Sequence, residues 1–248
     1  MTSPVADADG TRRTTDGVER RVVAAPGLGP AVRQASGDFY YNSWRLVPAN
    51  LAWAAGLLLL LLLGGTGNPL LAVVSAPLLA FPTFGLFRMA GLIHRGNGVS
   101  LGDSFSAWRS MWPRILVLGV VLVGAAIVFV TNLAVGIVRQ DVVGIAIATA
   151  AAWGVLALVI LGAIIWPLAA DPDRADRSFR DIVKLAATLA IGFPVRFGGL
   201  TIVLLVVLAI STVLFVALLT VGIAFVALLS TRFVLPAADR LEARTGRR

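Results

Sequence analysis

The polar side chains that could do chemistry in this chain are few, and several lie inside long apolar stretches. Asn50 and Trp53 are about one helical turn apart, so their amide and indole groups could together hydrogen-bond a polar solute. Asn132, which follows Thr131 in a separate apolar stretch, offers the same chemistry. The alternative role of these groups is structural, because amides and aromatic rings in apolar helices commonly join neighbouring helices.

Other reactive groups are scarce. The chain has no cysteine, so a disulfide framework, a thiolate metal site and a cysteine nucleophile are excluded. His94 is the single histidine, and we expect it to face lipid headgroups or cap a helix rather than sense pH or bind a metal. No P-loop, serine-hydrolase, zinc-protease or dinucleotide-binding motif occurs in the sequence. We therefore predict no catalytic, metal or cofactor-binding residue, and we predict that the protein is not an enzyme.

The composition predicts the environment of these groups. Hydrophobic residues make up 58% of the 248 residues and charged residues 14%. A soluble globular protein is typically about 45–50% apolar and about 25% charged. The composition therefore excludes an ordinary soluble domain and a disordered chain, and it predicts an all-α fold, a polytopic bundle of transmembrane helices.

Uncharged runs define the expected spans, because a helix needs roughly 20 residues to cross a bilayer. No charged residue lies between Arg45 and Arg88, and the sequence GGTGNP at 64–69 divides that run in two. The run 197–231 would form one helix about 52 Å long, against a hydrocarbon core of about 30 Å, so we expect a turn within 211–222. The six predicted spans are 46–63, 69–87, 115–138, 142–170, 197–214 and 217–234.

The basic residues predict the orientation. With six spans, 20 of the 21 lysine and arginine residues lie on one side of the membrane, and Arg139 lies on the other. Cytoplasmic segments of membrane proteins carry such an excess of positive charge. With five spans, the last five arginines would lie on the opposite side, which disfavours that topology. We therefore predict a multi-pass protein of the plasma or inner membrane with both termini in the cytoplasm.

The net charge of +8 would suggest a nucleic-acid partner in a soluble protein. Here the charges flank apolar runs, so we expect contacts with anionic lipid headgroups on the cytoplasmic side, and no nucleic-acid partner. Residues 1–37 contain interleaved arginines and acids but no apolar run, which predicts a disordered cytoplasmic tail and not a signal peptide. The transmembrane domain is expected over 38–236, followed by a basic cytoplasmic C-terminus at 237–248.

Two loops on the predicted cytoplasmic side share a pattern. Each begins with S-x-x-D, at Ser100 and at Ser178, and continues through an amphipathic stretch to an aromatic–proline pair and an arginine. A serine followed three residues later by an acid favours the start of a helix. We therefore predict interfacial helices at 100–112 and 179–192, with a degenerate third copy at 38–48. The architecture is then three modules, each an interfacial helix followed by a membrane hairpin.

The first of these helices carries aromatic residues on one face. Its expected anchors in the headgroup layer are Phe105, Trp108, Arg109 and Trp112, with the guanidinium of Arg109 directed to phosphates. An interfacial helix binds a membrane through buried apolar area and through attraction to anionic lipid. The same face could instead dock a protein partner.

Two stretches resemble the YesL-like bacterial membrane proteins, a family of unknown function. One is 44–53 (WRLVPANLAW), where N-L-x-W opens the first span, and the other is 81–88 (FPTFGLFR) with the loop and helix that follow at 98–109. The resemblance extends over roughly 38–235 in layout, while the arginine-rich tail and the Ala/Val-rich later spans depart from it. It implies a helical integral membrane protein and an association with carbohydrate uptake, and it supplies no catalytic residue.

Two functions remain after these exclusions. The first is an accessory of a carbohydrate or solute uptake system, whose interfacial helices would contact a sugar ABC transporter or a second copy of the chain. The second is a small facilitative permease for a neutral solute, with a central polar cavity lined by Asn50, Asn132 and hydroxyl groups. A membrane enzyme is disfavoured because the predicted spans contain no ionisable side chain.

Overall fold

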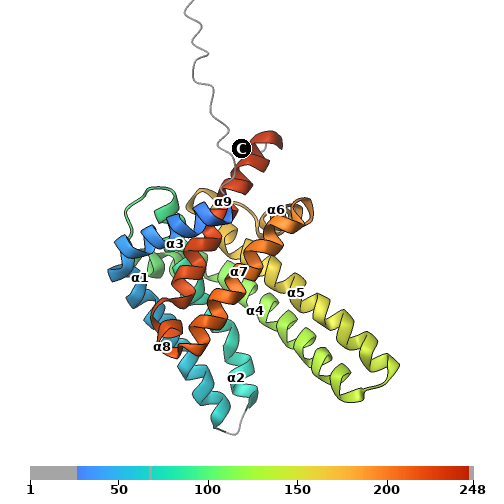
Figure 1. Cartoon of the computed structure of the whole chain (residues 1–248). Helices are drawn as coiled ribbons and strands as arrows, with labels where there is room; N and C mark the ends of the chain where they lie inside the picture. Colours follow the sequence, from blue (N-terminus) through green and yellow to red (C-terminus); the bar gives the residue numbers. More distant parts are fainter. Residues whose placement is uncertain (1–26, 67–68, 246–248) are drawn as a thin grey trace, which may run out of the picture.

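The structure, a computed structural model, describes residues 27–66 and 69–245, and these are helical with no strand among them. Six segments within these ranges are long and apolar enough to cross a membrane. The predicted all-α transmembrane bundle is therefore confirmed (Figure 1). Of the expected disordered tail, residues 1–26 lie outside the described residues.

The elements form three hairpins, in which α1 pairs with α2 and α3, α4 with α5, and α7 with α8 and α9. The turn of the third hairpin falls at Leu214, inside the interval 211–222. The elements in chain order are α1 (Leu28–Gly65), α2 (Pro69–Ser75), the 3₁₀ turn η1 (Ala76–Leu79), α3 (Ala80–His94), α4 (Leu101–Arg139), α5 (Val142–Ala170), the 3₁₀ turn η2 (Pro172–Arg174), α6 (Phe179–Gly192), α7 (Pro194–Val213), α8 (Phe215–Ala217), the π-helical turn η3 (Leu218–Gly222) and α9 (Ile223–Thr245).

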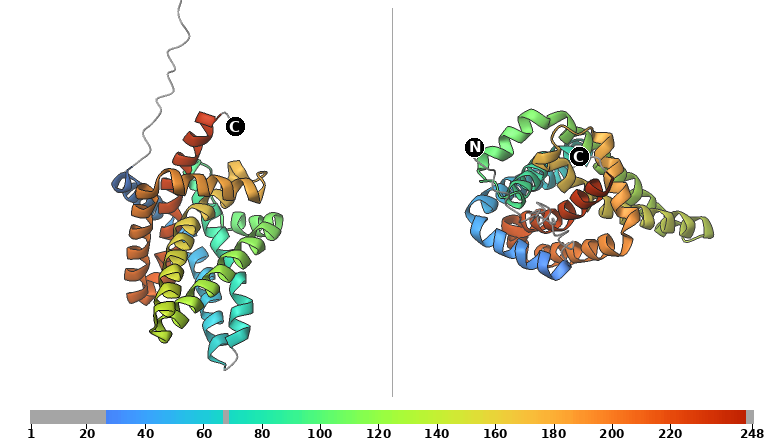
Figure 2. Two further views of the ribbon diagram at one scale, coloured as in Figure 1. Left: turned by 90° about the vertical axis from the view of Figure 1, so that its right-hand side faces the viewer. Right: turned by 90° about the horizontal axis from the view of Figure 1, so that it is seen from above.

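The second helix of each hairpin lies at the centre of the bundle. The helices α3, α5 and α9 pack against one another, and α1, α4 and α7 pack around them. Fully buried side chains such as Phe84 of α3, Leu168 of α5 and Phe233 of α9 form this core. The view from above in Figure 2 shows the first helices of the hairpins around these inner helices.

Three helical segments lie across one end of the bundle, which we call the charged end: the first part of α1, the first turns of α4, and α6 (Figures 1 and 2). Their corners coincide with prolines. The backbone of α4 departs from helical geometry at Met111, two residues before Pro113, and α6 ends at Gly192, with its C-cap Phe193 directly before Pro194. Proline removes a helical hydrogen bond and restricts the preceding residue, so a helix bends or ends there.

The predicted caps begin two of these segments. The Ser100 backbone N–H donates to the Asp103 carboxylate at 2.6 Å, which closes a capping box at the start of α4. The Ser178 hydroxyl oxygen accepts from the backbone N–H of Asp181 at 3.2 Å at the start of α6. The expected interfacial helix at 179–192 has the observed bounds of α6, whereas the segment expected at 100–112 continues through its bend into the span.

Helices extend past both expected ends of the transmembrane domain. The helix α1 begins at Leu28, inside the segment expected to be a disordered tail, because Ala31 and Ala35 are fully buried against the core. These small side chains share one helical face but do not form an apolar run. At the other end, α9 continues to Thr245, and the side chain of Glu242 is buried there.

Glycines allow close approaches between the first two hairpins and within the second. A Cβ atom on Gly119 of α4 would lie 2.7 Å from the carbonyl oxygen of Pro77, in the 3₁₀ turn that interrupts the second span. A Cβ atom on Gly136 would lie 2.6 Å from the carbonyl oxygen of Gly144 across the α4–α5 hairpin. The outer part of the α4–α5 hairpin leans away from the other helices (Figure 1).

Candidate functional site

The densest group of charged side chains in the described residues lies at the charged end, where the inner helices α3 and α5 finish. Asp171 directly follows α5, and its side chain has 0% exposure to solvent. Arg95, which follows α3, donates from Nη2 and Nε to the two carboxylate oxygens of Asp171 at 2.6 and 3.1 Å. Such a bidentate pair between arginine and a carboxylate is strong and fixes the relative orientation of its partners.

Arg174 extends this arrangement to α9. Its guanidinium, which is also buried, pairs with Asp171 and donates from Nη2 to Asp239 and to Glu242, both at 2.6 Å. Arg95 also reaches Asp239, at 2.8 Å. We call these five residues the ion-pair network.

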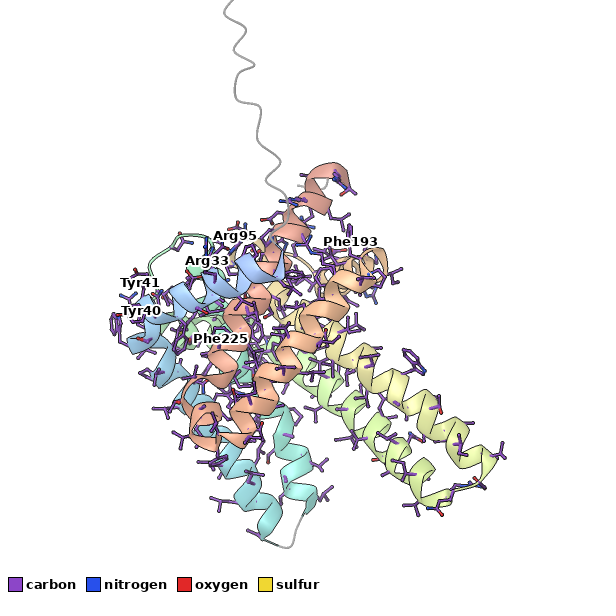
Figure 3. The ribbon with its side chains drawn as sticks, viewed as in Figure 1. Arg33, Tyr40, Tyr41, Arg95, Phe193 and Phe225 are labelled. Atoms are coloured by element: carbon purple, nitrogen blue, oxygen red, sulfur yellow. The ribbon has the colours of Figure 1, made fainter. Side chains whose placement is uncertain are left out.

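The ion-pair network joins the three hairpin modules. Arg95 follows the first hairpin, Asp171 and Arg174 follow the second, and Asp239 and Glu242 belong to the third. Burial alone would lower the pKa of Arg95 and of Arg174, but their hydrogen bonds to the carboxylates raise the pKa of each above its ordinary value. Both arginines therefore stay cationic at any physiological pH, and Arg95 is labelled at the charged end in Figure 3.

A second ion pair ties α9 to the first part of α1. Arg232 donates to the two carboxylate oxygens of Asp38 at 2.5 and 2.8 Å. His94, which we expected to face headgroups or cap a helix, has its Nδ1 atom 3.4 Å from the guanidinium of Arg232. Its ring is half-buried beside this pair.

Asn50 holds an irregular part of the third hairpin. Its amide nitrogen donates to the carbonyl oxygens of Leu218 and Leu219 at 3.0 and 2.7 Å, and its amide oxygen accepts from the backbone N–H of Ala224 at 2.8 Å. The π-helical turn η3 interrupts the regular helical ladder here, so backbone groups need other partners. Asn50 is fully buried, and both its amide nitrogen and its amide oxygen are hydrogen-bonded to backbone groups. Its role is therefore structural, and it does not face a solute.

The structure does not bring the other candidate polar residues together with Asn50. The indole N–H of Trp53 donates to the Thr83 hydroxyl at 3.1 Å, which joins α1 to α3. Asn132 is exposed on α4, and its amide donates to the Val128 carbonyl of the same helix at 2.8 Å. The proposed polar lining of a permease is therefore divided between separate parts of the bundle.

An open pocket of about 370 Å³ lies between the helices, and its lining is apolar. Helices of all three hairpins contribute residues to its lining. Among these residues are Phe87 and Trp166, whose rings stack with their centres 6.0 Å apart. The hydroxyls of Thr83 and Ser230 face this region, but each donates to a carbonyl of its own helix at 2.8 Å. The pocket suits hydrocarbon rather than a polar solute.

The expected interfacial anchors lie on the first turns of α4. Phe105, Arg109 and Trp112 are exposed, whereas Trp108 is half-buried and contacts Phe105 edge-on, with the ring centres 4.8 Å apart. Tyr40 and Tyr41 of α1, labelled in Figure 3, and nearby Trp44 are also exposed. The charged end thus carries aromatic side chains on two of its three crossing segments, as an aromatic layer at a membrane interface does.

Within residues 27–66 and 69–245, no group of three or more His, Cys, Asp or Glu side chains is placed to hold a metal ion. Sequence reasoning did not identify the ion-pair network, because it treated the arginines of the charged end as contacts for lipid. One signal was available. Asp171 follows the last apolar residue of α5, whereas the first charged residue at the same end of each other predicted span is an arginine, so this acid needed a basic partner.

No protein-family model, curated protein or solved structure matches this chain. The resemblance to the YesL-like proteins therefore stays a prediction. The six apolar helices still define the class, which is a multi-pass α-helical membrane protein.

Proposed function

We propose that this protein is a non-enzymatic scaffold of the plasma or inner membrane that acts as an accessory of a solute-uptake system, with its charged end in the cytoplasm. The observation that carries the proposal is the ion-pair network, which joins all three hairpins at the charged end. A solute path between the inner helices would have to disrupt these buried pairs. A fixed bundle is instead suited to presenting its surface to a partner.

The exposed aromatic side chains of the charged end supply the contact surface. Phe105 and Trp112 project from the first turns of α4, and Tyr40 and Tyr41 project from α1. Aromatic residues are enriched where proteins bind one another. The orientation rests on the basic residues, because within the described part of the chain Arg139 is the one that lies at the opposite end.

The test is purification of the full chain from its native membrane, with the co-purifying proteins identified. We expect subunits of a solute transporter, and we expect their recovery to fall when Phe105 and Trp112 are both changed to serine. A matched control changes the exposed residues Val138 and Val142 to serine at the other end of the bundle. Equal recovery in both variants, or no transporter subunit in either, would contradict the proposal.

A flux measurement distinguishes the proposed scaffold from the alternative function, a facilitative permease. Proteoliposomes that contain only this protein should take up neutral sugars no faster than protein-free liposomes, since the pocket between the helices has an apolar lining. Faster uptake would favour the facilitative permease. Reporter fusions near residues 98 and 176 should give a cytoplasmic signal, and fusions near 140 a signal from the opposite side.

A further inference from the structure

A small pocket rich in arginine lies where the corner between α6 and α7 meets the last turns of α9. Its volume is about 110 Å³. The lining residues are Phe193, Arg196, Ala237, Arg240, Leu241 and Arg244.

The lining of this pocket contains three arginines and no acid. Arg240 and Arg244 lie one turn apart on α9, a spacing at which like charges destabilise a helix. Among the described residues, no carboxylate lies within 4.0 Å of either guanidinium, and the neighbouring Glu242 already pairs with Arg174 and Arg177. An anion between the arginines would remove this repulsion.

The pocket lies at the boundary between hydrocarbon and water. The segment Phe215–Thr245 has 31 residues and is about 46 Å long, so its last turns extend beyond a hydrocarbon core of about 30 Å. On the other side of the pocket, the α6–α7 corner presents apolar side chains. Ile191 and Val195 are 81% and 89% exposed, and Phe193 is labelled at this corner in Figure 3.

We propose that this pocket binds the phosphate of an anionic phospholipid. Arg240 and Arg244 donate to the phosphate oxygens, Arg196 adds a third positive charge, and the acyl chains lie along Ile191 and Val195. The planar fork of an arginine matches a phosphate with two parallel hydrogen bonds. Basic pockets at the cytoplasmic ends of transmembrane helices are suited to anionic headgroups.

The same lining gives a preference among lipids. Phosphatidylcholine carries a cationic group beside its phosphate, and the pocket offers no acid to pair with it. Phosphatidylglycerol has no such cation, so we expect it to bind more tightly. This inference requires only that the protein lies in a bilayer, and it is independent of the scaffold role proposed above.

The test measures how much phosphatidylglycerol stays bound. The full chain is reconstituted in nanodiscs of phosphatidylcholine and phosphatidylglycerol and released into mild detergent, and the retained lipid is counted by native mass spectrometry. Each arginine near an anionic surface contributes about five-fold in binding, so Arg240→Gln with Arg244→Gln should weaken retention roughly 25-fold. Arg33→Gln is the matched control, because Arg33 is exposed at the same end (Figure 3) and lies outside the pocket.

The outcomes are distinct. An equal loss in the Arg33→Gln variant, or equal retention of phosphatidylcholine and phosphatidylglycerol by the unaltered chain, overturns the proposal. If inorganic phosphate, added to phosphatidylcholine nanodiscs, raises the unfolding temperature as much as phosphatidylglycerol does, the site is one for free phosphate and the lipid assignment is wrong. If the double glutamine variant does not fold, Arg240→Lys with Arg244→Lys keeps both charges, and it should retain less phosphatidylglycerol than the unaltered chain.

Discussion

The two ends of the bundle hold their charges in different ways. At the charged end, Arg95 and Asp171 pair although they are far apart in the sequence, and the carboxylate of Asp171 is fully buried. At the opposite end, Arg139 pairs at 3.0 Å with Asp141, two residues away, and both side chains are about half exposed. The first kind of pair joins separate hairpins, whereas the second stabilises only the turn in which it lies.

The helices also differ in how much of their apolar part is buried inside the bundle. In the most apolar 18-residue window of the segment Phe215–Thr245, 61% is buried inside the bundle, but in that of α5 only 11% is buried. In a bilayer the hydrophobic effect does not drive helices together, because lipid tails are as apolar as the side chains. We infer that the modules are held together chiefly by polar contacts and close packing near the charged end, and that the outer part of the α4–α5 hairpin faces lipid.

The largest effect should come from Asp171→Ala. This change removes the fully buried carboxylate that Arg95 and Arg174 share and leaves them with Asp239 and Glu242 as partners, and removing one partner of a buried pair typically costs about 3–5 kcal/mol. Asp173→Ala is the matched control, because Asp173 also pairs with Arg95 but is 60% exposed, and it should cost at most about 1 kcal/mol. Thermal unfolding in detergent measures both. Equal stability of the two variants would show that the network does not hold the modules together.

A smaller effect should come from Gly119→Ala. The added Cβ atom would lie 2.7 Å from the Pro77 carbonyl oxygen, so the backbones of the first two hairpins must separate, at about 1–3 kcal/mol. Gly124→Ala on the same helix has nothing within 4 Å of the added atom and should stabilise the protein by up to about 1 kcal/mol, since alanine is the better helix former. Opposite signs for the two changes in the free energy of unfolding would identify close packing as the second contact between modules. Equal signs would contradict it.

The next effect concerns the contact between the first and third hairpins. Asn50→Leu removes the hydrogen bonds to Leu218, Leu219 and Ala224 and leaves the π-helical turn η3 without them. Hydrogen bonds between membrane helices average about 0.6 kcal/mol and reach about 1.7, so we expect a loss of about 1–2 kcal/mol. Asn132→Leu is the control, because its amide contacts only its own helix, and its stability should change little. Hydrogen exchange of residues 214–224 should rise in the Asn50 variant alone.

The parts of the fold that the sequence predicts are local. The cap at Ser100 and the corner at Pro194 depend on neighbouring residues, so their position follows from spacing alone. The helix α5 has the predicted bounds 142–170 because charged residues flank one long apolar run. The sequence predicts the turn after Val213 only to within the interval 211–222, since no glycine or proline stands at the turn itself.

The ion-pair network and the start of α1 could not be predicted in this way. The partners Arg174 and Glu242 meet because α5 and α9 pack side by side at the centre, and no local pattern in a single sequence specifies that packing. Similarly, Ala31 and Ala35 are buried only because α1 crosses the charged end, so a composition typical of a disordered tail was misleading. Contacts between residues a few positions apart can be predicted from the sequence. Contacts between modules, whose residues are distant in the sequence, cannot.

The smallest effect should come from Arg139→Gln, at the end opposite to the network. An exposed pair contributes about 0–1 kcal/mol, and this one joins no separate elements, so the free energy of unfolding should change by less than about 0.5 kcal/mol. Asp141→Ala should be more harmful, because the Asp141 carboxylate also accepts from the backbone N–H of Gly144 at 2.6 Å and caps α5. These two bonds, to Arg139 and to Gly144, lower the pKa of Asp141, so its contribution is present at neutral pH and is lost as the pH falls below the usual carboxyl range. The unfolding temperatures of the unaltered chain and the Asp141 variant should therefore converge in acid, whereas a large effect of Arg139→Gln at neutral pH would mean that this end, too, holds the modules together.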